Sequence, residues 1–164
     1  MHEMNDCVFS PGRAYRYTLR HDAPGMSMVD LFDGKRVMWI GLNPSTADEN
    51  QLDPTLRRIR GFTASWGYCE FVMTNLFAFR ATDPREMRLA ADPVGPMNDH
   101  WLADTANGAD LIVAAWGALG TYRNRANDVR RLLEARPMFC LGLTHNGQPR
   151  HPLYVKRSTR LVRL

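Results

Sequence analysis

The sequence predicts an α/β protein: a three-layer α/β/α sandwich with a mostly parallel central sheet. Two observations predict it. Short, continuous apolar runs, which are typical of strands buried on both faces, occur at residues 36–42, 69–79, 110–117 and 137–143. Amphipathic segments separate these runs, and strands that alternate with helices are typical of a parallel sheet covered by helices on both faces.

The other elements follow from local patterns. Residues 14–21 alternate in the manner of a half-buried strand, and 21–35 form a loop with Pro-Gly and Asp-Gly turns. The helix expected over 53–67 has Asp53 as its N-cap, Pro54 at its first position and a glycine at its end. Further helices are expected at 83–90, 95–109 and 118–135, and a loop at 144–152.

Length and composition bound the class of protein. A chain of 164 residues fits one domain over 1–164, with a core at 13–155 and a basic tail at 156–164. It contains no run of about 18 apolar residues, and its N-terminus lacks the apolar region of a signal peptide. Three scattered cysteines without a CxxC pattern favour a reducing compartment. We therefore expect a cytoplasmic protein with no membrane segment.

The net charge of +4 is compatible with a polyanionic partner without requiring one. The last segment, PRHPLYVKRSTRLVRL, is rich in basic residues. It is either a solvated strand or frayed end, or a surface that contacts phosphates.

The sequence lacks the motifs of several common enzymatic reactions. No GxxxxGKS/T, GxGxxG or GxSxG pattern occurs, which disfavours ATP hydrolysis, dinucleotide binding and serine-hydrolase chemistry. The residues His100, His145 and His151 do not have the spacing of metal ligands. Cys140 and Trp116 fall in predicted buried strands, which favours a place in the core. We expect no metal and no cofactor.

Polar side chains follow the predicted strands at the points where the strands end. They are Asn43-Pro44-Ser45, Asn75 and Trp116-Gly117, and the loop after the fourth strand adds His145, Asn146, Arg150 and His151. Because the carboxyl ends of parallel strands meet at one edge of the sheet, where ligands bind, we expect these groups to converge. Asn and neutral His are donors and acceptors suited to reading a base edge or positioning a water molecule.

Each of these residues also has a purely structural interpretation. Asn43 could complete its own turn, and Ser45 and Thr46 could cap a helix rather than leave backbone amides for a phosphate. His151 precedes a proline, as surface turn residues often do. For Asn75 a functional role is favoured over a structural one, because Asn is disfavoured in strands and a buried amide needs hydrogen-bond partners.

A series of motifs in order resembles a known family. They are GLNPSTAD, DPTLRR, TNLFAFRATDP, DPVGPMND, AAWGA and LGLTHNGQPRHPLYV. Over residues 13–155 the chain closely resembles the bacterial and phage family labelled domain of unknown function 1643, whose name implies no activity.

The same landmarks resemble, more distantly, the uracil-DNA glycosylase superfamily, which implies a uracil-DNA-glycosylase-like α/β/α sandwich. GLNPS at 41–45 is similar to the GxNPG motif of the mismatch-specific thymine/uracil branch. TNLFAFRATDP at 74–84 is similar to a strand that ends in a base-reading Asn, and AAWG at 114–117 to a strand that ends in Gly before a helix. RHPLYV at 150–155 is similar to a late HPS motif, with Leu153 in place of Ser.

This resemblance implies a division of roles. A base would leave the helix and enter the pocket, because enzymes that act on bases in duplex DNA must unstack them. Asn75 would read its Watson–Crick edge, Asn43 would orient the attacking water, and His151 would stabilise charge on the leaving base. Ser45, Thr46 and the basic tail would hold flanking phosphates. The residues expected to bind substrate are Gly41, Leu42, Pro44, Ser45, Thr46, Asn75, Trp116, Gly117 and Arg150.

The chain departs from the superfamily at three points. The acidic water activator of the most active branches is absent, with Asp48 and Glu49 as the nearest substitutes. No aromatic residue lies between Pro44 and Phe62 to stack behind a base, and the Ser after His-Pro is missing.

Three hypotheses of function therefore stay open. The first is a hydrolase of the N-glycosidic bond of a damaged, mismatched or modified base in DNA, or of a nucleoside. The second is a non-catalytic module of a DNA-modification or defence system that binds a nucleotide or nucleic acid. The third is a hydrolase of an unrelated substrate on the same fold. The expected partner is DNA or a nucleobase or nucleotide ligand.

Overall fold

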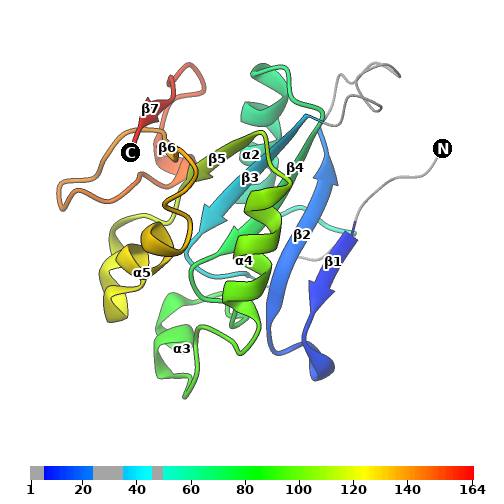
Figure 1. Cartoon of the computed structure of the whole chain (residues 1–164), viewed down its shortest axis with the longest axis vertical. Helices are drawn as coiled ribbons and strands as arrows, with labels where there is room; N and C mark the ends of the chain where they lie inside the picture. The colour runs from blue at the N-terminus through cyan, green and yellow to red at the C-terminus, as the bar shows by residue number, and fades with distance from the viewer. Residues whose placement is uncertain (1–5, 24–34, 46–49) are drawn as a thin grey trace.

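The computed structural model describes residues 6–23, 35–45 and 50–164, and its centre is a seven-stranded sheet in the order β1-β2-β4-β3-β5-β6-β7 (Figure 1). The strands are β1 Asp6–Phe9, β2 Arg16–Asp22, β3 Arg36–Gly41, β4 Glu70–Asn75, β5 Leu111–Ala114, β6 Phe139–Cys140 and β7 Val162–Arg163. The α/β class predicted from the sequence is confirmed.

The sheet is mixed, with parallel strands in the middle and antiparallel strands at both sides. Strands β4, β3, β5 and β6 run parallel to one another, whereas β2 and β7 run antiparallel to their neighbours β4 and β6, and β1 antiparallel to β2. Gly41 pairs with Asn75, so β3 and β4 end side by side. Leu19 pairs with Met73, which brings the start of the reversed strand β2 to the same edge of the sheet.

Helices cover both faces of this sheet. Helix α2 (Pro54–Ser65) lies on one face, and α4 (Asn98–Asn107) and α5 (Arg125–Leu132) lie on the other, together with the short α3 (Pro84–Leu89) (Figure 1). Three 3-10 segments complete the order of elements: η1 (Pro11–Arg13), η2 (Ala118–Asn124) and η3 (Pro152–Tyr154).

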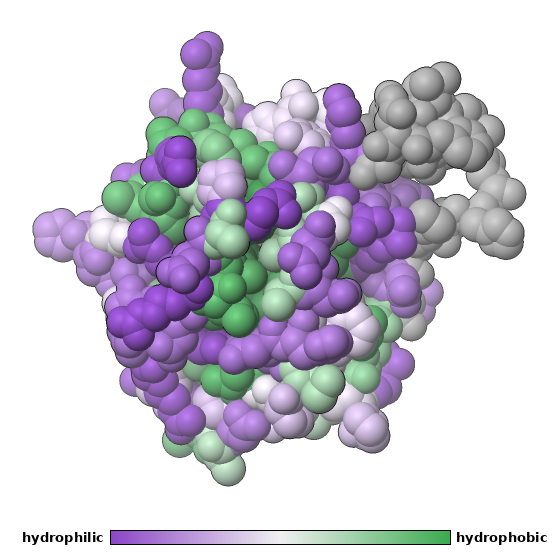
Figure 2. Space-filling view, in the orientation of Figure 1, coloured by the Kyte–Doolittle hydropathy of each residue, from purple (hydrophilic) through white to green (hydrophobic). Residues whose placement is uncertain are grey.

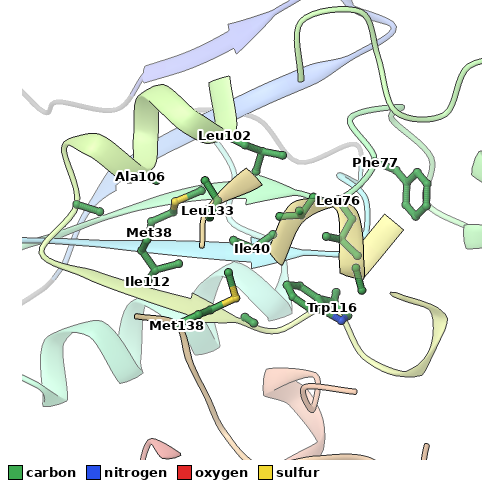
Figure 3. Packing of buried hydrophobic residues seen from close by; sticks show 14 of the residues in the cluster. Met38, Ile40, Leu76, Phe77, Leu102, Ala106, Ile112, Trp116, Leu133 and Met138 are labelled. Carbon is green, nitrogen blue, oxygen red and sulfur yellow. The ribbon is translucent and has the colours of Figure 1, made fainter. Parts of the chain in front are cut away.

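Two hydrophobic cores, one on each face, hold the layers together. Alternate residues of the central strands point to opposite faces, as the pleat requires. The core beneath α4 and α5 includes Met38, Ile40, Leu76, Leu102, Ile112 and Leu133 (Figure 3). The core beneath α2 includes Trp39, Leu56, Ile59, Phe62 and Phe71. Cys140 has no exposed surface, and burial raises the pKa of its thiol, as expected of a core cysteine.

The structure corrects some of the predicted elements. The single helix expected over 118–135 is divided into η2 and α5, because Arg123 and Asn124 have φ values of 51° and 56° and interrupt the helix. Of the strand expected over 137–143, only Phe139–Cys140 forms a strand, and Leu143 makes an isolated bridge to Pro149. Most of the loop expected at 21–35 lies outside the described residues.

The two ends of the described chain add edge strands: β1, which no pattern predicted, and β7, in the tail for which a strand was one of the alternatives. Asp6–Phe9 pairs with β2, and Val162–Arg163 pairs with β6, so part of the expected basic tail belongs to the sheet. Helices long and apolar enough to cross a bilayer are absent from the described ranges. The face that carries α4 and α5 is covered mainly by hydrophilic side chains, with hydrophobic areas between them (Figure 2).

A buried carboxylate secures the end of β4 that lies away from the polar strand ends. Glu70 accepts a hydrogen bond from Arg20 Nε at 2.8 Å and another from Arg36 Nε, and its side chain is 6% exposed. The pair of arginines ties β2 and β3 to β4 at this edge.

Replacing Glu70 by Ala is expected to lower the free energy of unfolding by about 3 kcal/mol, because two partly buried arginines would lose their carboxylate. Urea denaturation followed by tryptophan fluorescence measures the change. Glu86→Ala, at an exposed position of α3, is the control and should change it by less than about 0.5 kcal/mol. Equal effects of the two substitutions would contradict the role of the Glu70 ion pairs.

Candidate functional site

A cavity of about 370 Å³ lies where β3, β4 and β5 end. Its wall is built from the segment after β3, the last residue of β4, the segment after β5, the start of α2 and the start of η3. Of the residues predicted to form a site, the structure brings together Gly41, Leu42, Asn43, Pro44, Ser45, Asn75, Trp116, Gly117 and His151. The roles assigned to them remain predictions.

Three residues of the last loop that were expected to converge here, His145, Asn146 and Arg150, do not line the cavity. The Arg150 side chain is exposed, and its Nε donates to the Leu143 carbonyl at 2.9 Å, so it braces its own loop. Thr46 lies outside the described residues, as do Asp48 and Glu49.

Asn75 is the most unusual polar residue of the cavity. It is 1% exposed, and neither its Nδ2 nor its Oδ1 has a hydrogen-bond partner among the described residues. A buried amide without partners lowers stability, and such groups are rare in folded proteins. The amide lines the cavity, where one donor and one acceptor can meet a ligand.

Gly41 makes the room that the Asn75 amide occupies. A Cβ atom added to Gly41 would lie 2.8 Å from Asn75 Oδ1 and 2.5 Å from Met73 Cε. The amide therefore lies directly against the backbone of the neighbouring strand, and any larger residue at position 41 would displace it.

The backbone of Asn75 is held from the opposite side of the sheet. Asn98 Nδ2 donates to the carbonyl oxygens of Asn75 and Leu76, both at 3.0 Å. Arg125 Nε donates to the Leu76 carbonyl at 2.8 Å, and its Nη2 donates to Asp99 Oδ1 at 2.6 Å. Sequence reasoning missed Asn98 and Arg125, because polar residues in amphipathic helices give no sign that they point inward.

The side chain of Asn43 is fixed by two hydrogen bonds that its amide group donates. Its Nδ2 donates to the Ala81 carbonyl at 2.8 Å and to the Pro44 carbonyl at 3.2 Å. Both bonds use donor hydrogens, so the group that Asn43 can offer to a water molecule is the acceptor Oδ1.

His151 presents a neutral imidazole. Its Nδ1 accepts a hydrogen bond from the Leu153 amide at 3.2 Å, which places the proton of the neutral ring on Nε2. Burial lowers the pKa of His151 below 6.5, and the Asp53 carboxylate opposes this shift. At neutral pH the ring is therefore an uncharged donor through Nε2.

Ser45 and Asp53 form a second polar pair in the wall. Ser45 Oγ donates to Asp53 Oδ2 at 2.6 Å, and Asp53 Oδ1 accepts from the Leu56 amide at 2.8 Å. Asp53 is thus the helix cap that its sequence context predicted. The Ser45 hydroxyl braces this cap.

Three charged or aromatic residues of the cavity lining were not predicted from the sequence as parts of a site. Arg16 is 2% exposed and lines the cavity because β2 runs antiparallel to β4. Tyr154 also lines it, and its ring centroid is 5.4 Å from that of His151. Asp53, predicted only as a cap, is the acidic residue of the described lining.

Trp116 supplies an aromatic surface in the wall. Its Nε1 donates to Gln148 Oε1 at 2.9 Å, and a Cβ added to Gly120 would lie within 2.1 Å of the ring. The indole is therefore fixed between a hydrogen bond and a glycine. Trp116 is also buried in the core, as its apolar strand predicted, and its role toward a substrate remains a prediction.

Comparison with known families decides one point. The family described as "Protein of unknown function (DUF1643)" matches residues 16–153. The chain belongs to the DUF1643 family. No curated protein and no solved structure matches it.

A metal centre finds no support in the described part of this DUF1643 protein, where no group of three or more His, Cys, Asp or Glu side chains is placed to hold an ion. The polar side-chain groups of the cavity lining are amides, hydroxyls, one imidazole, one indole, one carboxylate and one guanidinium. This set suits recognition of a ligand through hydrogen bonds.

Two buried asparagines allow a matched test of the site in the DUF1643 protein. Asn98→Ala is expected to lower the free energy of unfolding by about 2 kcal/mol, because two buried carbonyl groups lose a donor. Asn75→Ala removes an amide that has no partner, and we expect a change of less than about 1 kcal/mol. Urea denaturation of both variants measures the difference. An equal loss in the two would contradict the view that the Asn75 amide serves a ligand.

Stability of the DUF1643 protein should also depend on the titration of His151. Because the folded pKa lies below the unfolded value near 6.5, the unfolded chain binds a proton first as the pH falls. The contribution of His151 to the free energy of unfolding is therefore complete above pH 6.5. Between pH 6.5 and the pKa of the folded state it declines as the pH falls, with a slope of at most about 1.4 kcal/mol per pH unit.

Urea denaturation of the wild type and of His151→Asn at several pH values measures this contribution. Asn can still accept the Leu153 amide hydrogen bond and does not titrate. The difference in free energy between the two proteins should be constant above pH 6.5 and fall below it. A difference independent of pH would contradict the lowered pKa.

Proposed function

We propose that this DUF1643 protein recognises a nucleobase in the cavity and hydrolyses the N-glycosidic bond of a damaged, mismatched or modified base in DNA, or of a nucleoside. The observation that carries the proposal is the Asn75 amide, buried and without a partner among the described residues, in a cavity that also contains Asn43 and His151.

Recognition rests on the amide and on the aromatic wall. An asparagine amide offers a donor and an acceptor side by side, which matches the edge of a base that itself has one of each. Trp116 and Tyr154 line the same cavity and can contact the face of a base. They supply the aromatic surface that the segment between Pro44 and Phe62 lacks.

The chemistry rests on Asn43 and His151. In the hydrolysis, the C1′–N bond breaks and its electron pair goes to the base, while a water oxygen bonds to C1′ and releases a proton to solvent. Asn43 Oδ1 orients the water, since an amide is too weak a base to keep the proton. The His151 Nε2–H donates to the negative charge that develops on the base, where a neutral imidazole stabilises an anion without delivering a full proton.

The order of the motifs supports the same reaction. The segment Gly41–Ser45, Asn75, Gly117 and the His151-Pro152 pair occur in the order of the corresponding motifs of the uracil-DNA glycosylase superfamily, which the chain resembles. In this proposal the α/β/α layers serve as a uracil-DNA-glycosylase-like scaffold.

A specific observation favours a second function, binding of a nucleotide or nucleic acid without hydrolysis. Asp53 is the acidic residue of the described lining, and both of its oxygens already accept hydrogen bonds, from Ser45 and Leu56. It is poorly placed to activate water.

A base-release assay separates the two functions. Oligonucleotides that contain uracil, a G·T mismatch, hypoxanthine or an oxidised base are incubated with the protein, and alkali then cleaves any abasic sites. Free nucleosides are tested in parallel by chromatography. We expect release that falls at least about 100-fold in Asn43→Ala and His151→Asn, because both act on the transition state.

His100→Asn, at an exposed position outside the cavity, is the matched control and should keep full activity. Release that is equal in His151→Asn and His100→Asn would contradict the mechanism. No release from any substrate, with binding that depends on Asn75, would contradict hydrolysis and support the binding function.

A further inference from the structure

A second groove, of about 570 Å³, lies beside the cavity and is strongly basic. Among the described residues, its lining contains four arginines, Arg57, Arg58, Arg60 and Arg157, and no acidic residue. None of the four forms an ion pair with a described residue, whereas Arg20, Arg36, Arg85 and Arg125 each have a carboxylate partner. The groove therefore concentrates positive charge that no carboxylate of the described ranges neutralises.

The groove and the cavity share two elements. Along α2, Thr55, Leu56 and Ile59 face the cavity, and the arginines on the other side of the helix face the groove. Along η3, Pro152 and Tyr154 line the cavity and Leu153 lines the groove. A ligand with a base in the cavity can therefore continue over α2 and η3 into the groove.

The four arginines have different roles. Arg58 donates to the Val155 carbonyl and lies over the Phe62 ring at 5.6 Å, so it connects η3 to α2. Arg57 Nη1 donates to the Leu52 carbonyl at 2.6 Å. The side chains of Arg60 and Arg157 have no hydrogen bond within the described structure, and Arg157 is exposed. Their guanidinium groups are the ones best able to bind a ligand.

Gly61 opens the floor of the groove. It is exposed in the middle of α2, and a Cβ added there would have no atom within 4 Å. A bare backbone between arginines lets an extended polyanion approach the helix closely.

We infer that this groove binds the sugar–phosphate backbone of a nucleic-acid strand, one nucleotide of which enters the cavity. The inference rests on the proposed function, because it assumes that the cavity holds a base and that this base is part of a nucleic-acid strand. Arginine guanidinium groups bind phosphates strongly and in a bidentate way, and backbone contacts set the register of a strand without reading its sequence.

The test measures binding of a fluorescein-labelled single-stranded oligonucleotide, about 15 nucleotides long, by anisotropy over about 50 to 200 mM KCl. In Arg60→Gln/Arg157→Gln we expect Kd to rise at least about 10-fold and the salt dependence of log Kd to fall by about 1.4, for two lost phosphate contacts. Arg130→Gln/Arg131→Gln changes the net charge equally on α5, on the other face of the sheet, and should have little effect.

A second pair of variants tests the effect of a negative charge in the groove without removing any side-chain contact. Gly61→Glu places a carboxylate in open space in the groove, and Gly61→Gln is its uncharged match. Both should fold at least as stably as the wild type, because each replaces a helical glycine. We expect Gly61→Glu to bind the oligonucleotide at least about 10-fold more weakly than Gly61→Gln.

The outcomes separate the groove from the reaction. Loss of base release from DNA but not from a nucleoside in Arg60→Gln/Arg157→Gln would support both proposals. Binding that depends on the groove, without base release from any substrate, would support the groove and reject hydrolysis. The groove assignment is overturned if the α2 and α5 double variants bind alike, if the wild type does not bind the oligonucleotide, or if poly-glutamate competes as well as an unlabelled strand.

Discussion

The turn that follows β4 is the constraint on which the site depends. The Leu76 amide donates to the Gly41 carbonyl at 2.9 Å, so the ends of β3 and β4 are tied together beyond their last paired residues. From the helical layer, Asn98 and Arg125 donate to the Asn75 and Leu76 carbonyls. Because the backbone is fixed from both sides, the Asn75 side chain keeps its position without hydrogen bonds of its own.

Much of the fold could be predicted from the sequence because its central strands are parallel and buried on both faces. Such strands appear as continuous apolar runs, and β3, β4 and β5 lie within the expected segments. The Asp-Pro start of α2 marked a helix through its capping chemistry. The edge strand β1 is short and depends on tertiary pairing, so no local pattern marked it, and for β7 a strand was only one of the alternatives. The helical pattern over 118–135 was misleading, because Arg123 and Asn124 adopt left-handed backbone conformations.

The candidate site was predictable to the extent that it follows from the parallel strands. Asn43, Asn75 and Trp116 come from the ends of three such strands, which must meet at one edge. Arg16 could not be predicted from the ends of parallel strands, because it begins the antiparallel strand β2. The apolar pattern of a strand does not show the direction in which the strand runs. Three arginines of the groove were equally hidden, since they look like the ordinary solvated face of an amphipathic helix, whereas Arg157 lies in the basic tail that was expected to hold phosphates.

Helix α2 contributes to the core, to the cavity and to the groove, because each of its sides faces a different one of them. Leu56, Ile59 and Phe62 fix the helix to the sheet, and this packing determines where its other sides lie. Its N-terminal end carries Asp53, which holds Ser45 and raises the pKa of the neighbouring His151 against the effect of burial. Its outer side carries the arginines of the groove. In the proposed complex, the spacing between a base at Asn75 and a phosphate at Arg60 is set by the packing of α2 against the sheet, which exists before any ligand binds.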